Sequence, residues 1–310
     1  MPPKSIFYSP DILTYTTTHT LPEAVACARL SRPNPHDGPL SPTDITVRMV
    51  GAVGSDEFGP RLIHGMKTDG IDTSSIRIVE EQTTGVAVIL VEESTGQNRI
   101  LLNPGANSTL LPSSFLTPPS LGSPLPDLII LQLEIPLETA LQIIETAKKS
   151  GVDVLLNPAP AVPLPDEVFQ GLAHLIVNES EAAILAGRAV EDVEAPDFDW
   201  EIITSEFLRK GVKNMIVTLG AKGAFWASAG GENGGKGYVD AEKVERVVDT
   251  TAAGDTFVGA YAVRIVEGER ERDMGSVVRG ACTAAGRTVE SEGAQSAIPW
   301  ADEVERPRKS

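Results

Sequence analysis

Apolar runs and amphipathic segments alternate along most of this chain of 310 residues. Continuous apolar runs are typical of parallel strands buried on both faces, and they occupy residues 45–54, 128–133, 152–158, 173–178 and 212–219. Helical spacing of apolar residues is found at residues 56–69, 137–150, 179–187, 256–266 and 274–289. The alternation predicts an α/β fold, a doubly wound and mostly parallel sheet with helices on both faces.

One pair of strand-like segments interrupts this order. Residues 86–91 and 98–102 are joined by a turn that contains Thr95 and Gly96, which predicts a β-hairpin. The glycine-rich residues 230–237 we interpret as a hairpin loop between strands rather than a phosphate-binding loop. No internal repeat or linker divides the chain, so we expect a single domain over residues 1–310 with a small β-appendage.

The charge and composition exclude several kinds of partner. The chain has 43 Asp and Glu against 26 Lys and Arg, a formal net charge of −17, which argues against nucleic acid as a partner. A pocket that uses backbone N–H groups and a divalent cation can still hold a nucleotide. No run approaches the ~20 apolar residues that span a bilayer, so no membrane partner is expected. Two cysteines favour a reducing compartment, and the four histidines show no metal-binding spacing.

The run from Val248 to Tyr261 carries the strongest functional signal, because small residues lead directly into an apolar helical pattern. The first N–H groups of a helix are unpaired, and with the helix dipole they form an anion site. Ala252, Ala253 and Gly254 leave room for a phosphate. Asp255 places a carboxylate beside the phosphate. A base in this position can deprotonate a hydroxyl that attacks the phosphate. The alternative is an ordinary strand–turn–helix junction.

Polar residues also follow two other strands, at Asn178 to Glu181 and at Thr218 to Gly223. Ligands of open α/β sheets bind outside the carboxyl ends of the strands, so both segments are expected to share a crevice with Asp255. Lys222 could reach a phosphate there. Glu134 ends a further apolar strand, either as a functional carboxylate or as the cap of the helix that follows Pro136.

Taken in order from about Ala24 to Glu303, these motifs resemble the PfkB family of carbohydrate kinases. The most specific element is Asp249 to Phe257, DTTAAGDTF, which is similar to the second signature of the family in its ribokinase form. The run Gly293 to Trp300 is similar as well. Further similar segments are residues 131–134, 157–161, 178–181 and 218–223.

The resemblance implies ATP-dependent phosphorylation of D-ribose at its 5-hydroxyl, with Mg²⁺ and with K⁺ as monovalent activator. It implies Asp255 as the base, Ala253 and Gly254 in the anion hole and Glu134 near the magnesium and phosphate region. Contacts to ATP are implied for Asn178, Thr218, Leu219, Gly220, Ala221, Lys222, Gly223 and Gly254. Ligands of the monovalent cation are implied at Asp249, Thr251, Thr288, Ser291, Gly293 and Ala297, where Ala297 replaces a common serine.

The N-terminal part departs from the family pattern. Asp11 resembles the sugar-binding aspartate, but its companion Asn is Ser9 here. Residues 17–23 replace a lid strand and a Gly-Gly-Lys-Gly-Ala-Asn run, and Pro22 stands where a sugar-binding Asn is expected. The resemblance thus implies a partly truncated β lid, with strands at about 12–17 and 86–102, through which family members often form homodimers.

These departures suggest that the phosphate half of the site is intact and the sugar half impaired, because each unmade buried hydrogen bond costs about 1–3 kcal/mol. Two alternatives stay open. The chain could be a kinase of another sugar or of a nucleoside, or a nucleotide-binding protein without catalysis. In each case we expect an intracellular protein, cytoplasmic and also nuclear, that binds small molecules.

Overall fold

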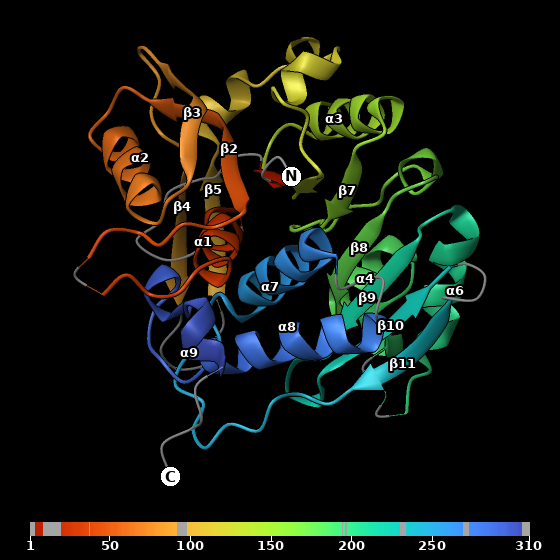
Figure 1. Cartoon of the computed structure of the whole chain (residues 1–310). Coiled ribbons are helices and arrows are strands. Elements are labelled where there is room, and N and C mark those ends of the chain that lie inside the picture. Colours follow the sequence, from red (N-terminus) through yellow and green to blue (C-terminus); the bar gives the residue numbers. More distant parts are fainter. Residues whose placement is uncertain are drawn as a thin grey trace.

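A nine-stranded sheet forms the centre of the molecule (Figure 1). The computed structural model describes residues 4–8, 20–36, 38–91, 98–193, 195, 197–229, 234–268 and 273–305. In spatial order the strands are β11 (Gly235–Val239), β10 (Ala224–Ser228), β9 (Asn214–Thr218), β8 (His174–Asn178), β7 (Asp153–Leu156), β6 (Leu128–Leu131), β1 (Lys4–Tyr8), β2 (Ile45–Gly54) and β3 (Asp72–Val79). All pairs from β9 to β3 are parallel, and the pairs of β10 with β9 and β11 are antiparallel. The prediction of a mostly parallel sheet is confirmed.

Helices cover both faces of the sheet, as predicted. They are α1 (Thr20–Leu30), α2 (Phe58–Thr68), α3 (Leu137–Ser150), α4 (Glu179–Leu185), α5 (Val190–Val193), α6 (Trp200–Lys210), α7 (Ala253–Glu267), α8 (Met274–Thr288) and α9 (Ala301–Glu305). Helices α1, α2, α7 and α8 pack against one face and α3, α4 and α6 against the other. Figure 1 shows α7 and α8 crossing in front of the strands.

The central strands supply both cores because neighbouring side chains point to opposite faces. On β6, Ile130 belongs to the core under α7 and α8, whereas Ile129 and Leu131 belong to the core under α3. On α7, a Cβ at Gly259 would overlap the Ala26 side chain of α1. The glycine thus brings α7 and α1 together.

Local signals explain several helix boundaries. Helix α3 begins and ends where the sequence predicts, and Gly151 ends it with a left-handed φ of 72°. Helix α4 begins with a capping box, in which Asn178 Oδ1 accepts from Glu181 N and the Glu181 carboxylate accepts from Asn178 N. Helix α7 begins at Ala253, three residues before the predicted start, and this difference places Asp255 in its first turn.

The predicted hairpin is present as β4 (Val86–Val91) paired antiparallel with β5 (Asn98–Asn103), a separate two-stranded sheet. The other predicted lid strand, at about 12–17, lies outside the described residues, and so do Asp11 and Ser9. The glycine-rich loop also connects strands as predicted, since β10 and β11 form an antiparallel hairpin. Its last glycines, Gly235 and Gly237, belong to β11 itself.

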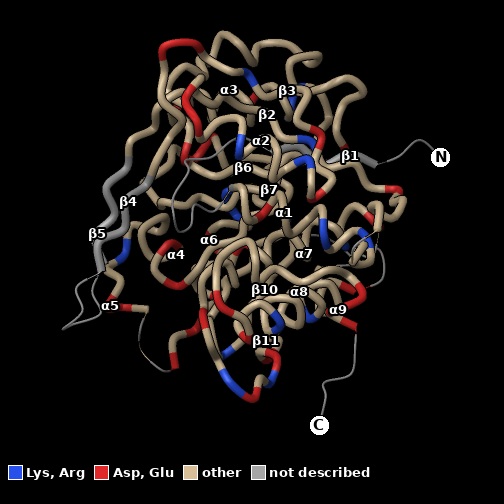
Figure 2. Tube along the Cα trace, turned by 90° about the vertical axis from the view of Figure 1, so that its left-hand side faces the viewer, with Lys and Arg blue, Asp and Glu red and all other residues tan. Residues whose placement is uncertain are grey.

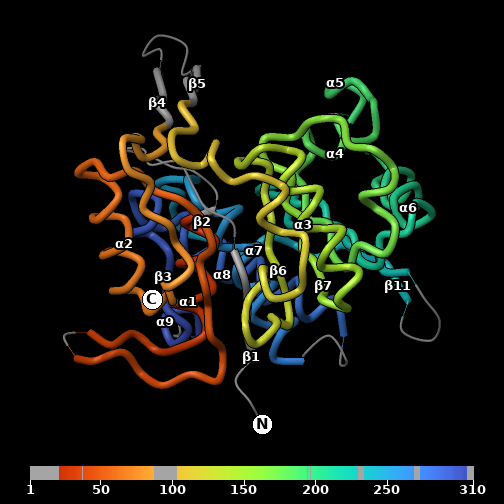
Figure 3. The backbone as a smooth tube through the Cα atoms, turned by 90° about the horizontal axis from the view of Figure 1, so that it is seen from above, coloured from red at the N-terminus to blue at the C-terminus, as the bar shows by residue number. Residues whose placement is uncertain are grey.

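The C-terminal part of the chain returns to α1, and Figure 3 shows α9 beside α1. Arg29 of α1 donates from Nη1 to the carbonyl oxygens of Gln295 and Ile298, at 2.7 and 3.0 Å, and its guanidinium lies over the Trp300 ring. Acidic residues are spread over the described tube with fewer basic ones among them (Figure 2). None of the helices within the described ranges has the length and apolarity needed to cross a bilayer.

Candidate active site

The start of α7 has an unusual backbone conformation. Ala252, the residue before the helix, has φ 60° and ψ 6°. These angles lie in the left-handed region, which residues other than glycine rarely adopt. Such a residue costs about 1–2 kcal/mol, and strain of this kind is concentrated at functional sites. Thr256 N donates to Ala252 O at 2.8 Å, which closes the first turn.

The space over this helix start is open. Gly254 is exposed, and a Cβ on it would meet nothing within 4 Å. The N–H groups of Gly254 and Asp255 belong to the first turn, where the helix itself offers no acceptor. Asp255 follows in the same turn and is only 3% exposed. Its place in the first turn, next to the open space over Gly254, fits a functional acid beside an anion site.

A cavity of about 460 Å³ extends from this helix start. Its size lies in the range of small-molecule sites. Three parts of the chain line it, and most of the side chains are small or apolar: Thr218, Gly220, Ala221 and Gly223 after β9; Ala241, Glu242, Val244, Val247 and Thr250 before α7; and Ala253, Gly254, Phe257, Cys282, Ala285, Gly286 and Val289 of α7, α8 and the residue after α8. The structure therefore joins the predicted ATP segment and the predicted anion hole in one cavity.

The turn after β9 uses its two glycines differently. At Gly223, with φ 97°, a Cβ would overlap the Val239 carbonyl oxygen of β11, so only glycine fits. At Gly220, with φ 54°, a Cβ would meet nothing within 4 Å. Leu219 N donates to Gly223 O at 2.8 Å and closes the turn. Gly223 therefore holds the turn against β11, while Gly220 leaves room beside the cavity.

Three residues predicted to contact ATP do not line the cavity. Leu219 is 4% exposed and belongs to the core under α4 and α6. Lys222 is exposed, and its Nζ lies 3.3 Å from Glu179 Oε1 in a surface ion pair, an interaction that contributes little to stability. Asn178 lies opposite Thr218 in the β8–β9 register and caps α4 through its side-chain oxygen.

Most of the predicted cation ligands meet between the start of α7 and the end of α8. The Asp249 carboxylate accepts from Thr251 N at 2.9 Å and from Gly293 N at 3.0 Å. Hydrogen bonds from the Thr251 side chain and backbone and from Gly293 N lower the pKa of Asp249 below its ordinary value. Val248 N donates to Val289 O at 2.8 Å and joins the same two segments.

The remaining predicted cation ligands are Thr288 and Ser291, at and after the end of α8, and Ala297, farther along the chain. Thr288 is fully buried, and its Oγ1 lies 2.9 Å from Thr256 Oγ1. Ser291 N donates to Thr288 O. Ala297 lies in the short helix η7 (Gln295–Ala297), beside the carbonyl groups that Arg29 holds. Within the described ranges, no group of three or more His, Cys, Asp or Glu could hold a metal ion.

Glu134 lies three residues beyond β6 and is half-buried. The N-cap residue of α3 is Pro136, which makes no side-chain hydrogen bond to the start of the helix. The interpretation of Glu134 as a helix cap is therefore wrong, because the chain enters α3 directly from the proline.

The sequence analysis missed a buried polar pair close to this point. Glu23, in the first turn of α1, is fully buried, and Gln132, directly after β6, is 2% exposed. Gln132 Nε2 donates to Glu23 Oε2. The only signal for this pair in the sequence is an acid within an apolar helical segment. The pair connects the last of the divergent residues 17–23, in the first turn of α1, to the carboxyl end of the central strand β6.

Comparison with known proteins agrees with this geometry. The family model for pfkB family carbohydrate kinases matches residues 23–301. A ribokinase from Schizosaccharomyces pombe is 42% identical over 284 residues, which cover 91% of this chain and 83% of that protein. The crystal structure of ribokinase from Thermotoga maritima has a TM-score of 0.73 at 32% identity and covers 98% of both chains. That of ribokinase from Cryptococcus neoformans, in complex with ADP, has a TM-score of 0.72 at 26% identity, covering 97% of this chain and 99% of that one. This chain belongs to the pfkB family of carbohydrate kinases.

Proposed function

We propose that this protein is a ribokinase, which transfers the γ-phosphoryl group of ATP to the 5-hydroxyl of D-ribose. The observation that carries the proposal is the 460 Å³ cavity, which runs from the turn after β9 to the start of α7, where Asp255 is buried. The similarity to the ribokinase of S. pombe supports ribose as the acceptor, and the ADP complex of the Cryptococcus enzyme supports an adenine nucleotide in the cavity.

In this mechanism Asp255 accepts the proton of the attacking hydroxyl. The N–H group of Gly254 would face the transferring phosphoryl group and stabilise its charge without rearrangement. Ala253 would lie beside it in the anion hole, although its own N donates to Thr250 O at 3.3 Å. The residues after β9 would hold the rest of the nucleotide, with Thr218, Gly220, Ala221 and Gly223 at the cavity wall. Positioning and electrostatics then supply most of the acceleration, as is usual for phosphoryl transfer.

Two cations belong to the proposal. Mg²⁺ bound with ATP would neutralise the phosphates, and it is usually held by one or two carboxylates together with the phosphates, a pattern that the single carboxylate of Glu134 fits. We place K⁺ at the turn formed by Asp249, Thr251, Thr288, Ser291 and Gly293, with Ala297 as the last ligand inferred from the resemblance. Hydrogen bonds already hold residues 248–251 to residues 289–293. Replacing K⁺ by a tetraalkylammonium ion should therefore lower kcat and leave the fold unchanged.

The sugar half of the proposed site is the less complete part. Asp11 is the proposed contact to ribose, the hairpin β4–β5 is the proposed lid, and a homodimer formed through that lid is proposed. We further propose a single domain over residues 1–310, located in the cytoplasm.

The variant Asp255→Asn tests the proposal. General-base catalysis contributes about 10²–10⁴-fold, so ribose-dependent ADP release should fall by that factor, while ATP affinity changes by less than about twofold because the neutral amide leaves the anion hole in place. Asp44→Asn, an exposed residue before β2, is the matched control and should keep full activity. Wild-type turnover in Asp255→Asn would show that Asp255 is not the base.

A second candidate function is nucleotide binding without sugar phosphorylation. It is favoured by Pro22, which is buried in the first turn of α1 and has neither a backbone N–H nor a polar side chain for a sugar. A coupled assay with ribose, 2-deoxyribose, a ketohexose and a nucleoside separates the candidates. Binding of ATP with no ADP release on any of the four would favour the second candidate over a ribokinase.

A further inference from the structure

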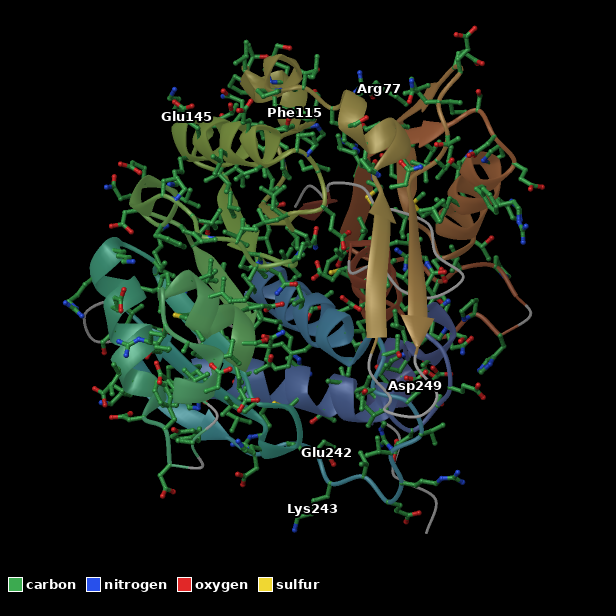
Figure 4. All side chains as sticks on the ribbon, turned by 180° about the vertical axis from the view of Figure 1, so that it is seen from behind. Arg77, Phe115, Glu145, Glu242, Lys243 and Asp249 are labelled. Atoms are coloured by element: carbon green, nitrogen blue, oxygen red, sulfur yellow. The ribbon has the colours of Figure 1, made fainter. Side chains whose placement is uncertain are left out.

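A second cavity, of about 430 Å³, lies at the other end of the molecule, between the strands β2 and β3 and the chain segment 110–123. It shares no lining residue with the nucleotide cavity. Figure 4 places Arg77 and Phe115, which line it, at the top of the view and Glu242, of the nucleotide cavity, at the bottom. The proposed kinase reaction leaves this cavity without a role.

The sheet places two arginines on one face here. The β2–β3 register pairs Val50 with Ser75 and Ala52 with Arg77, and residues two apart on a strand share a face. Arg77 therefore lies on the same face as Val50 and Ala52. Arg48 also lines the cavity, two residues before Val50. This face is covered by the short helices η1 (Gly105–Thr109), η2 (Pro112–Phe115) and η3 (Pro118–Leu121).

Both guanidinium groups have N–H donors that can bind a ligand. Arg48 donates from Nε to Asp72 Oδ2 at 2.8 Å, and its terminal nitrogens have no acceptor among the described residues. Arg77 is exposed and donates from Nη2 to the Thr109 carbonyl oxygen at 3.3 Å. Asp72 offsets one of the two positive charges but does not line the cavity, and none of the lining residues is acidic. A cavity wall with two arginines and no acidic residue is unusual in a chain with a net charge of −17.

The rest of the wall is rich in hydroxyl groups. Ser74, Ser75, Ser114, Ser120 and Ser123 all line the cavity, together with the apolar Leu110 and Phe115. Planar guanidinium groups match the oxygens of a phosphate, with which they form charge-assisted hydrogen bonds. Serine hydroxyls both donate and accept, as the hydroxyls of a polyol require.

We propose that this cavity binds a phosphate monoester of a small polyol, such as a sugar phosphate, with its phosphate on Arg48 and Arg77. The site is separate from the phosphate site at the start of α7. Arg77 also holds Thr109, the last residue of η1, and η1 follows the hairpin strand β5 in the chain. The ligand would therefore contact an arginine that also donates a hydrogen bond to the segment next to the proposed lid.

Calorimetric titration tests the site in protein saturated with Mg²⁺ and a non-hydrolysable ATP analogue, which occupies the start of α7. The probes are ribose 5-phosphate and inorganic phosphate. We expect Arg77→Gln to weaken binding about tenfold or more, the loss of one charged hydrogen bond. Arg61→Gln, which removes an exposed charge on α2, is the matched control and should change binding by less than about twofold. Arg48→Gln provides a second variant on the sheet.

The outcomes separate the possible ligands. If ribose 5-phosphate binds more tightly than inorganic phosphate, the serines bind the polyol part of the ligand. Equal affinities would mean that the site binds free inorganic phosphate instead of a phosphate monoester. Unchanged affinity in Arg77→Gln, or no binding of either probe, overturns the proposal. Neither Arg77 nor Arg61 lines the nucleotide cavity. The difference between the two variants therefore tests this site whether or not the protein is a ribokinase.

Discussion

The phosphate half and the sugar half of the proposed active site are built in different ways. The phosphate half comes from the C-terminal part of the chain, where the turn after β9, residues 241–250 and helices α7 and α8 meet around one cavity. The sugar half depends on Asp11, on the beginning of α1 and on the hairpin β4–β5, which pairs with no other strand among the described residues. The phosphate half therefore relies on backbone shape, and the sugar half relies on single side chains brought together from distant elements.

The two halves should differ in how well they tolerate amino-acid substitutions. A site made of backbone N–H groups keeps its chemistry when side chains vary, provided that they stay small. A site made of side chains loses a hydrogen bond with each replacement. Residues 249–257 resemble the family's second signature, whereas Pro22 and Ser9 stand where the resemblance implies asparagines that bind the sugar. Variants in each half can test the contrast.

Among the variants that compare the two halves, the largest effect is expected at Gly254, in the phosphate half. Gly254→Val would fill the open space over the start of α7 and displace the phosphoryl group from the N–H donors. Loss of one such donor costs about 10²–10³-fold in kcat. Stability should stay the same or rise slightly, since glycine disfavours a helix and the new side chain meets no atom within 4 Å at its Cβ. Steady-state kinetics and thermal unfolding measure the two effects.

Gly223→Ala is the matched change on the other side of the same cavity. Here the added Cβ overlaps the Val239 carbonyl oxygen and φ is 97°, so the turn must move and the variant should unfold at a lower temperature. If both variants lost stability equally, the open space at Gly254 would not be a binding space.

A smaller effect is expected at Glu23, beside the sugar half. Glu23→Ala removes the acceptor of Gln132 Nε2 in a fully buried place and should lower the free energy of unfolding by about 1–3 kcal/mol. Glu57→Ala, exposed at the start of α2, is the control and should change it by less than about 0.5 kcal/mol. Urea unfolding measures both. Equal stability of the two variants would mean that the buried pair contributes nothing.

The sequence predicted those features that local residues decide. The periodicity of residues 137–150 and the glycine at 151 define α3, and continuous apolar runs identify β2 and the central strands. The start of α7 could not be predicted to the residue, because Ala252 adopts a left-handed conformation that nothing in its side chain favours. The Glu23–Gln132 pair joins residues 109 positions apart and depends on how α1 packs near β6. The second cavity likewise depends on the β2–β3 register.

The smallest effect returns to the phosphate half, at the proposed cation turn. Two backbone N–H groups and the Thr251 side chain stabilise the charged form of Asp249 and lower its pKa. A carboxyl group with a lowered pKa stabilises the folded state at pH values above its unfolded-state pKa of about 3.9. This stabilisation is lost as the pH falls through the lower folded-state pKa. The wild type should therefore lose its advantage over Asp249→Asn as pH falls from about 5 to 3. Because the carboxylate is near solvent, the difference should stay below about 1 kcal/mol. Unfolding at a series of pH values measures it, and a constant difference down to pH 3 would show that the carboxylate does not hold the turn through its charge.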